Sequence, residues 1–439
     1  MKKRLLCVMV AAALLLGILT GCGGGTGESP GPDGSATPVT SKSPATSSTP
    51  EPSDTSEPFS GPTGEVVASG EAGEKVTWSF YSDGTFVISG IGRMEDYDDH
   101  RPWDEHRDGI SKVVIEDGVA SIGRVAFWGC SSLTSVIIPN SVTYIGEGAF
   151  GGCSSLTSMT IPNSVTIIEA GAFDGCSSLT SVTIPNSVTS IGYSAFRGCS
   201  SLTSVNVANG NPAYSSVDGV LFNADQTLLH TYPAEKNGAS YSIPTSVTTI
   251  EDSAFWGCSS LTSVTIPNSV TSIGYGAFYG CSGLTSVIIP DSVTSIGDSA
   301  FCDCSSLTGV AIPNGVTSIG DFTFLGCSSL TSVTIPNGVA IIGYGAFRGC
   351  SSLTSVTIPS GVAIIGYGAF WGCSSLTSVT IPNGISSNIA IGDDAFAGCG
   401  SLTDINYGGS ESQWLAEWIE SGAFGIASFP PNVTIHYNS

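Results

Sequence analysis

The sequence predicts a β-rich repeat solenoid, because one phrase returns with a fixed period and leaves the same positions apolar each time. Cysteine recurs every 23 residues from Cys130 to Cys199 and again from Cys258 to Cys373. A last copy ends at Cys399, after a three-residue insertion near Ser386. A fixed period of this size is the signature of stacked units that share one core.

The copy that starts at Cys258 shows how one coil is built. Its first apolar run has the spacing of a leucine-rich repeat strand, and Pro267 ends that strand because it has no N–H to donate. A second short apolar run follows, and then a turn closed by Gly280. Too few apolar side chains are present for a coil to fold alone, so neighbours must share them. The positions expected to face inward are Leu261, Val264, Ile266, Val270, Ile273, Ala277, Phe278 and Cys281.

The stretch from Ile266 to Cys281 and its copies resemble the BspA-type leucine-rich repeat of bacterial surface proteins. The resemblance covers roughly residues 110–406, and the flanking segments look like those of that family too. It implies an exported, non-enzymatic protein that binds other proteins or surfaces. The periodicity by itself predicts only the solenoid.

Residues 1–21 have the composition of a signal peptide. A basic Lys2-Lys3-Arg4 start precedes an apolar stretch from Leu5 to Leu19, which is short for a membrane span. The following Thr-Gly-Cys22 resembles a bacterial lipobox, in which the cysteine is lipidated and becomes the mature N-terminus. An ordinary secretory leader with an incidental cysteine is the alternative. We therefore expect lipid attachment at Cys22 and localisation on the bacterial cell surface.

Residues 22–62 are rich in Gly, Ser, Thr and Pro and lack apolar periodicity, which predicts a disordered stalk. Residues 63–109 differ from the repeat and predict an N-terminal β cap. Within it, Val76 to Phe80 alternates, Asp83-Gly84 is a turn signal, and Thr85 to Ile88 completes a hairpin. The acidic run from Glu95 to Asp99 lacks the spacing of a calcium loop and is expected to belong to this cap.

The solenoid itself is expected over residues 110–406, with about 13 coils. Between Cys199 and Cys258, 59 residues replace the two expected repeats, so one coil is longer by 13 residues. Two short apolar runs there predict an inserted hairpin near 208–240 that projects from the solenoid, and an extra piece of structural packing is the alternative. Residues 407–439 predict a C-terminal cap, with an amphipathic helix from Glu411 to Glu420 and a last strand from Asn432 to Tyr437.

Composition excludes several classes of partner. The formal net charge is −23 with only 13 Lys and Arg, so the chain lacks the cations that bind phosphate backbones or anionic lipid. We expect no nucleic acid partner and membrane contact through the N-terminal lipid alone.

No motif for catalysis, a cofactor or a metal is present. The four histidines do not recur in the repeats, and no Cys-x-x-Cys pair exists for zinc. The repeat cysteines are expected to form a ladder of free, buried thiols, although their stacking distance would also fit disulfides. Paired carboxylates for catalysis are not excluded, but nothing selects a pair.

Two positions of the repeat vary, one after the Ile-Gly pair and one before the Gly-Cys pair. Neighbouring coils should align Tyr344 with Tyr367 and Arg348 with Trp371, and a second cluster should contain Trp256, Tyr275 and Tyr279. These residue types are enriched at binding hot spots. They could equally cover the turns, with Arg348 stacked over Trp371.

Together these observations predict a non-enzymatic surface lipoprotein that binds host or microbial macromolecules, proteins more than glycans, through its repeat surface. A glycan-binding module and a structural cell-envelope spacer without a specific ligand remain alternatives. Many weak contacts, multiplied by display on a membrane, would supply the avidity.

Overall fold

The computed structural model describes residues 61–98, 100–382, 390–415 and 433–438. The expected signal peptide, most of the stalk with Cys22, the insertion near Ser386 and the end of the expected C-terminal helix lie outside these residues. The described residues belong to one compact unit, Gly61–Ser439.

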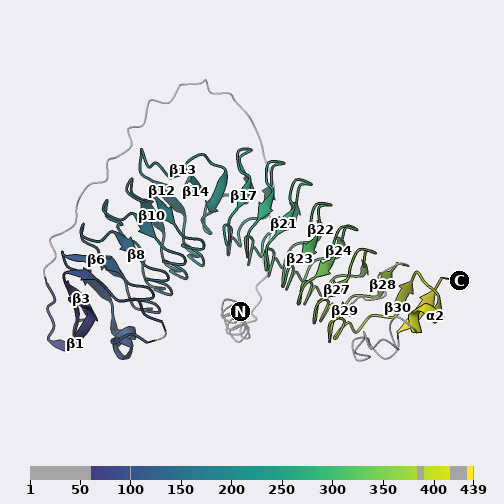
Figure 1. The fold of residues 1–439 in the computed structure, drawn as a ribbon, viewed down its shortest axis with the longest axis horizontal. Coiled ribbons are helices and arrows are strands. Elements are labelled where there is room, and N and C mark those ends of the chain that lie inside the picture. The colour runs from purple at the N-terminus through teal and green to yellow at the C-terminus, as the bar shows by residue number, and fades with distance from the viewer. Residues whose placement is uncertain (1–60, 99, 383–389, 416–432, 439) are drawn as a thin grey trace, which may run out of the picture. The chain divides into compact units, whose positions relative to one another are not determined.

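This unit is a β-solenoid of about 14 turns, as the sequence predicts, with almost no helix. Nearly every coil contributes one strand to a first row of parallel strands, and Figure 1 shows the coils following one another in chain order. The coil after Cys153 contributes only an isolated bridge from Ser158 to Ser181. The strands of this row are β5 (Lys112–Ile115), β7 (Ser135–Ile137), β10 (Ser181–Ile184), β12 (Ser204–Val207), β16 (Ser240–Ser242), β18 (Ser263–Thr265), β20 (Ser286–Ile288), β22 (Gly309–Ala311), β24 (Ser332–Thr334), β26 (Ser355–Thr357), β28 (Ser378–Ile381) and β30 (Asp404–Tyr407).

A second row of shorter parallel strands forms where each coil turns back. Paired residues in neighbouring coils are 23 positions apart in most pairs, as in Ile250 with Ile273, and 26 apart between β27 and β29. The strands of this row are β6 (Val119–Ile122), β8 (Tyr144–Ile145), β9 (Ile167–Ile168), β11 (Ser190–Ile191), β17 (Thr249–Ile250), β19 (Ser272–Ile273), β21 (Ser295–Ile296), β23 (Ser318–Ile319), β25 (Ile341–Ile342), β27 (Ile364–Ile365) and β29 (Ala390–Ile391).

All eight apolar positions predicted for the coil at Cys258 are buried, none more than 6 % exposed. Their most regular feature is a column of phenylalanine rings. Phe278, Phe301 and Phe324 stack with centroids 5.2 and 5.5 Å apart and planes within 4° of parallel. Offset stacking at this distance is favourable for aromatic rings, and a coil displaced by one residue would lose the register of this column.

The predicted ladder of free thiols is also present, since the twelve described cysteines are unpaired and buried. In most coils the thiol lies beside the phenylalanine carbonyl of the preceding coil, as in Cys281 Sγ to Phe255 O at 3.1 Å. Burial raises the pKa of the thiols of Cys130 and Cys176 to about 12, so both are neutral at physiological pH. Neutral thiols in an apolar column are chemically inert.

The outward Thr and Ser side chains hold neighbouring coils together. Thr271 Oγ1 donates a hydrogen bond to the carbonyl of Thr248 at 3.3 Å, and Thr285 Oγ1 donates to that of Thr262 at 3.1 Å. Ser351 Oγ does the same with Ser328 at 3.3 Å. Each hydroxyl thus bonds a residue 23 positions earlier, which explains why these positions are Thr or Ser in nearly every copy.

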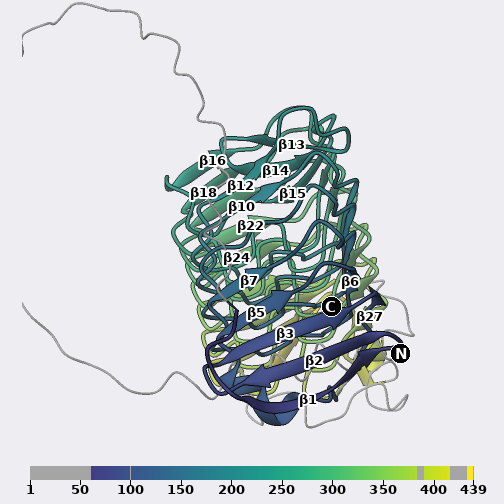
Figure 2. The same cartoon turned by 90° about the vertical axis from the view of Figure 1, so that its left-hand side faces the viewer.

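The N-terminal segment extends the first row. It contains β1 (Val66–Gly73), β2 (Val76–Tyr81), β3 (Thr85–Gly90), β4 (Gly92–Arg93) and the 3₁₀ helix η1 (Asp104–Gly109). The expected hairpin is β2 and β3, whereas β3 also pairs in parallel with β5. Figure 2 shows β1, β2, β3, β5 and β7 side by side in that order. Because β3 already forms a coil, the count is one higher than the sequence predicts.

The insertion forms β13 (Tyr214–Val217), β14 (Val220–Asn223) and β15 (Leu228–Thr231). The predicted hairpin exists as antiparallel β14 and β15, but the expectation that it projects from the solenoid is wrong. Phe222 and Leu229 are fully buried, and β15 pairs in parallel with β17. The hairpin is therefore part of the core, because its apolar side chains have the same need for burial as those of the repeats.

The C-terminal end shows α2 (Glu411–Trp414) and β31 (Thr434–Tyr437), which pairs in parallel with β30. The helix begins with a capping box between Ser410 and Gln413. Trp414 is buried with its ring edge-on to Tyr407, 5.2 Å between centroids. The rest of the expected helix, with Trp418, lies outside the described residues.

A partly buried acid and a buried histidine lie close together at the insertion. His230 Nε2 and Glu251 Oε2 are 3.5 Å apart, and neither atom has a hydrogen-bond partner. Burial lowers the pKa of His230 to about 4 and raises the pKa of Glu251 to about 7. Both shifts favour the neutral forms, so a largely uncharged imidazole lies next to a carboxyl that keeps its proton to higher pH than usual.

We predict that the free energy of unfolding of Glu251→Gln, measured relative to that of the wild type, increases as pH rises from about 4.5 to about 7. A carboxyl whose pKa is raised on folding contributes stability at low pH that is lost as pH rises through the folded value, by up to about 3 kcal/mol here. Denaturant unfolding at both ends of this range measures the difference, with Glu116→Gln at an exposed carboxylate as the control. A difference that does not change with pH would contradict the raised pKa of Glu251.

Candidate functional site

The turn after the second strand of each coil positions the variable side chains. In the coil of β25, Gly345 and Gly349 have φ of +56° and +75°, a conformation that glycine adopts without strain. A Cβ on Gly345 would lie 3.0 Å from the ring of Phe322 in the coil before. Glycine at this position therefore lets successive turns stack closely, so that side chains at equal positions become neighbours.

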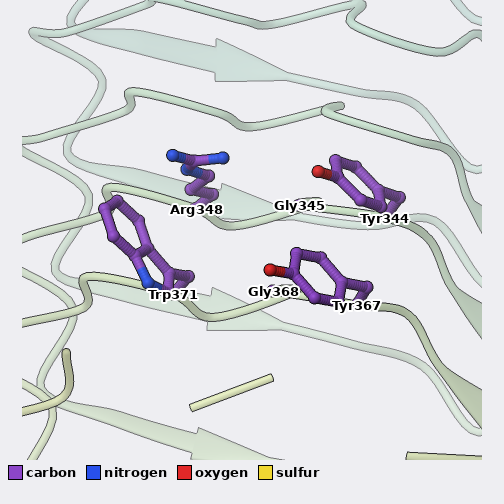
Figure 3. Close-up of a pocket in the computed structure, with 6 residues that line it drawn as sticks. All are labelled: Tyr344, Gly345, Arg348, Tyr367, Gly368 and Trp371. Carbon is purple, nitrogen blue, oxygen red and sulfur yellow. The ribbon is translucent and has the colours of Figure 1, made fainter. Parts of the chain in front are cut away.

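Two pairs of predicted residues meet in the coils of β25 and β27. The rings of Tyr344 and Tyr367 are 5.4 Å apart and within 13° of parallel. The guanidinium carbon of Arg348 lies 4.2 Å from the ring centroid of Trp371, which is a cation–π contact. Figure 3 shows both pairs side by side across the two coils. The alignment predicted from the period is therefore correct. We call these four residues the Tyr-Arg-Trp site.

The Tyr-Arg-Trp site encloses a shallow hollow of about 140 Å³, which Gly345 and Gly368 also line. Its three aromatic residues are 38 to 44 % exposed. Pockets for small-molecule ligands usually have volumes of about 300–1,000 Å³. The hollow is thus suited to one side chain of a larger partner.

Polar contacts fix the tyrosines. The Tyr344 N–H donates to Asp321 Oδ1 at 2.9 Å, and the Tyr367 hydroxyl donates to Asp394 Oδ2 at 2.9 Å. The hydrogen bond to Asp394 raises the pKa of Tyr367, so the phenol stays neutral at physiological pH. Phe322 extends the ring row, edge-on to Tyr344 with 4.8 Å between centroids.

The second predicted cluster is more heavily covered. Trp256 and Tyr279 stack with centroids 3.9 Å apart and planes within 4°, and both are half-buried. Tyr275 lies earlier in the same turn as Tyr279, and its N–H donates to Asp252 Oδ1 at 2.7 Å. This cluster covers the turns more than it presents a hollow.

The sequence did not reveal that Arg197 belongs to this second cluster. Its guanidinium carbon lies 5.1 Å from the centroid of the Trp256 ring, and the guanidinium forms an ion pair with Asp174. The long insertion separates Arg197 from Trp256 by 59 residues, so the simple period does not align them. Both occupy the position before Gly-Cys, and that shared position was the available signal.

Within the described ranges, no group of three or more His, Cys, Asp and Glu could hold a metal ion. In the acidic run, Asp96 accepts the Arg124 N–H at 2.8 Å and Asp98 forms an ion pair with Arg124. Asp99 lies outside the described residues. Among the residues that were searched, no helix has the length and apolar character needed to cross a bilayer.

Comparison with solved structures finds bacterial repeat proteins. A leucine-rich repeat protein from Eubacterium ventriosum is 29 % identical, with a TM-score of 0.63, over 76 % of this chain and 95 % of that chain. A leucine-rich repeat protein from Bacteroides ovatus is 27 % identical (TM-score 0.46; 84 % and 100 % covered). A leucine rich cell surface protein from Faecalibacterium prausnitzii is 26 % identical (TM-score 0.45; 80 % and 98 % covered). A search of curated proteins finds no match.

The family comparison covers most of the solenoid. The BspA type leucine rich repeat region matches in six copies, over residues 106–222, 234–328 and 294–424. These residues make up more than half of the chain and include both clusters of the variable positions. The chain therefore belongs to the BspA-type leucine-rich repeat family.

Proposed function

We propose that this protein is a non-enzymatic, lipid-anchored bacterial surface protein that binds proteins of a host or of other microbial cells. The Tyr-Arg-Trp site is the proposed centre of the binding surface. The observation that carries the proposal is that two adjacent coils present four stacked side chains of hot-spot type, three of them substantially exposed.

Membership of a leucine-rich repeat family supports a protein partner, because repeat solenoids bind through extended surfaces. The recurring Thr and Ser positions differ from the positions of the Tyr-Arg-Trp site. Where Thr and Ser recur, their hydrogen bonds to the preceding coil account for them. The positions of the Tyr-Arg-Trp site hold other residue types in some coils, such as Asp298 and Leu325, so coil stacking does not require Tyr, Arg or Trp there.

The N-terminal sequence supports the surface location. Lys2-Lys3-Arg4, the apolar stretch after it and Cys22 have the order of a lipoprotein leader. The Gly, Ser, Thr and Pro composition of residues 22–62 suits a stalk that carries the solenoid away from the membrane. Lipid anchoring concentrates many copies on one surface, which raises avidity for a repetitive partner.

A glycan ligand is the second candidate, because exposed Tyr and Trp rings also stack against sugar rings. Tyr344, Tyr367 and Trp371 offer such faces. A purely structural spacer is the third candidate, and it requires no saturable ligand at all.

We predict that replacing all four residues of the Tyr-Arg-Trp site by Ala weakens binding to a panel of extracellular matrix proteins and microbial cells by at least about 30-fold. Each hot-spot side chain contributes about 1–2 kcal/mol or more to affinity. Saturation binding to the panel, run beside a glycan array, measures the loss and separates protein ligands from glycan ligands.

Tyr193→Ala is the matched control, because Tyr193 is an equally exposed ring, at 48 %, outside the site. Circular dichroism of both variants should show the wild-type fold. Equal binding by the folded quadruple variant would exclude the Tyr-Arg-Trp site, and the absence of any saturable binding by the wild type would favour the spacer.

We further predict that Cys22→Ser releases the protein from the cell into the medium. Without the thiol no lipid can be attached, and the remaining leader would be processed as an ordinary secretory one. Cell fractionation and intact mass of the mature wild-type protein provide the measurement. A wild-type mature protein without Cys22, or with an unmodified Cys22, would refute the anchor.

A further inference from the structure

In two adjacent coils, Ala and Ile together replace the Thr and Ser that several other coils have before and at the start of their second strand. Four copies read Val-Thr-Ser-Ile-Gly, as at residues 270–274, where the Thr hydroxyl bonds the coil before. The coils of β25 and β27 read Val-Ala-Ile-Ile-Gly instead. Ile341 and Ile364 are paired neighbours, 40 and 43 % exposed. We call Ala340, Ile341, Ala363 and Ile364 the apolar strip.

Folding does not account for the apolar strip. The exposed part of an isoleucine side chain contributes no hydrophobic stabilisation to the fold. Ala340 and Ala363 lack the hydroxyl that would bond to the preceding coil. The strip also occurs where it would matter for recognition, since Tyr344 and Tyr367 follow Ile341 and Ile364 by three residues in the same two coils. The departure from the repeat and the Tyr-Arg-Trp site thus coincide.

Arg348 is unusual in its charge environment. It is the sole Lys or Arg after Lys236 in an otherwise acidic half of the chain. Ion pairs in the described part of the chain involve Arg101, Arg107, Arg124, Arg197 and two histidines, and none involves Arg348. By contrast, Arg197, which also stacks on a tryptophan, is neutralised by Asp174. Arg348 therefore offers a charge that no described carboxylate of the chain uses.

We infer that the Tyr-Arg-Trp site and the apolar strip together bind a polypeptide segment that combines an Asp or Glu with apolar side chains. The acidic side chain fits the 140 Å³ hollow against the Arg348 guanidinium, whose planar fork matches a carboxylate. The apolar side chains cover Ile341 and Ile364. This inference rests on the proposed function for the location of the site and adds the chemistry of the partner.

The strip favours a polypeptide over an acidic sugar. Sugar hydroxyls buried against isoleucine would lose their hydrogen bonds with water and find no partner, which costs about 1–3 kcal/mol for each group. Apolar peptide side chains on the same surface gain from burial. Arg348 alone would accept either carboxylate, so the Ile341–Ile364 pair decides between the two.

The test selects random peptides displayed on phage against the whole mature protein and follows the enriched sequences as synthetic peptides. We expect Asp or Glu next to apolar residues. Arg348→Gln should lower the affinity for these peptides about 10- to 100-fold, which corresponds to the loss of a hydrogen bond to a charged group. Arg348→Lys should recover part of the loss, and NaCl should weaken wild-type binding more than binding by Arg348→Gln.

The strip is tested by A340T/I341S/A363T/I364S, which restores residues that other coils already carry and so keeps the fold. It should lower the affinity for the same peptides by about 10-fold or more, because the apolar contact area of two isoleucines is lost. The matched control is T294A/S295I, which places the same apolar residues in the coil of β21, and it should leave affinity unchanged.

Three results would overturn the inference: no enriched peptide, enriched peptides without acidic residues, or Arg348-dependent binding of sialylated glycans alone. Equal affinities of wild type and Arg348→Gln for the enriched peptides would do so too. If the quadruple Ala variant loses partner binding while Arg348→Gln and the strip variant keep it, the proposed function stands and this inference fails. If the quadruple variant also keeps binding, the proposed site itself fails.

Discussion

The requirement that each coil return to the same place after 23 residues governs this structure. Three kinds of contact depend on it: the phenylalanine column, the thiols beside phenylalanine carbonyls, and the hydroxyls that bond the preceding coil. A side chain of the wrong size or polarity at any of these positions disturbs two neighbouring coils. Because each such change disturbs two interfaces between coils, most of the repeat is nearly the same in every copy within this chain.

The same constraint shows where variation is tolerated. Positions that point away from the shared core and bond no neighbouring carbonyl can change. One such position holds Asp174, Arg197, Tyr279, Arg348 or Trp371 in different coils. Stacking then brings unlike residues together without any dedicated loop. Arg348 over Trp371 and Tyr344 beside Tyr367 arise in this way.

Much of the fold was predictable from the sequence because it depends on period and polarity. The buried set at Leu261, Val264 and Phe278 follows from spacing alone, and so does the pairing of Tyr344 with Tyr367. The packing of β14 and β15 into the core was not predictable, because a hairpin signal contains no information about which face it covers. The insertion hid the contact of Arg197 with Trp256. The shifted pKa values of His230 and Glu251 depend on their burial, which no local pattern reveals.

The shared interior can be tested directly by labelling the native protein with iodoacetamide and locating the modified cysteines by mass spectrometry. The twelve described cysteines are buried, so the reagent cannot reach their thiols until the array unfolds. We expect all of them to remain unlabelled in the native state and to react together once denaturant unfolds the array. Rapid native labelling of cysteines within single repeats, such as Cys281 or Cys327, would contradict a continuous core built by stacking.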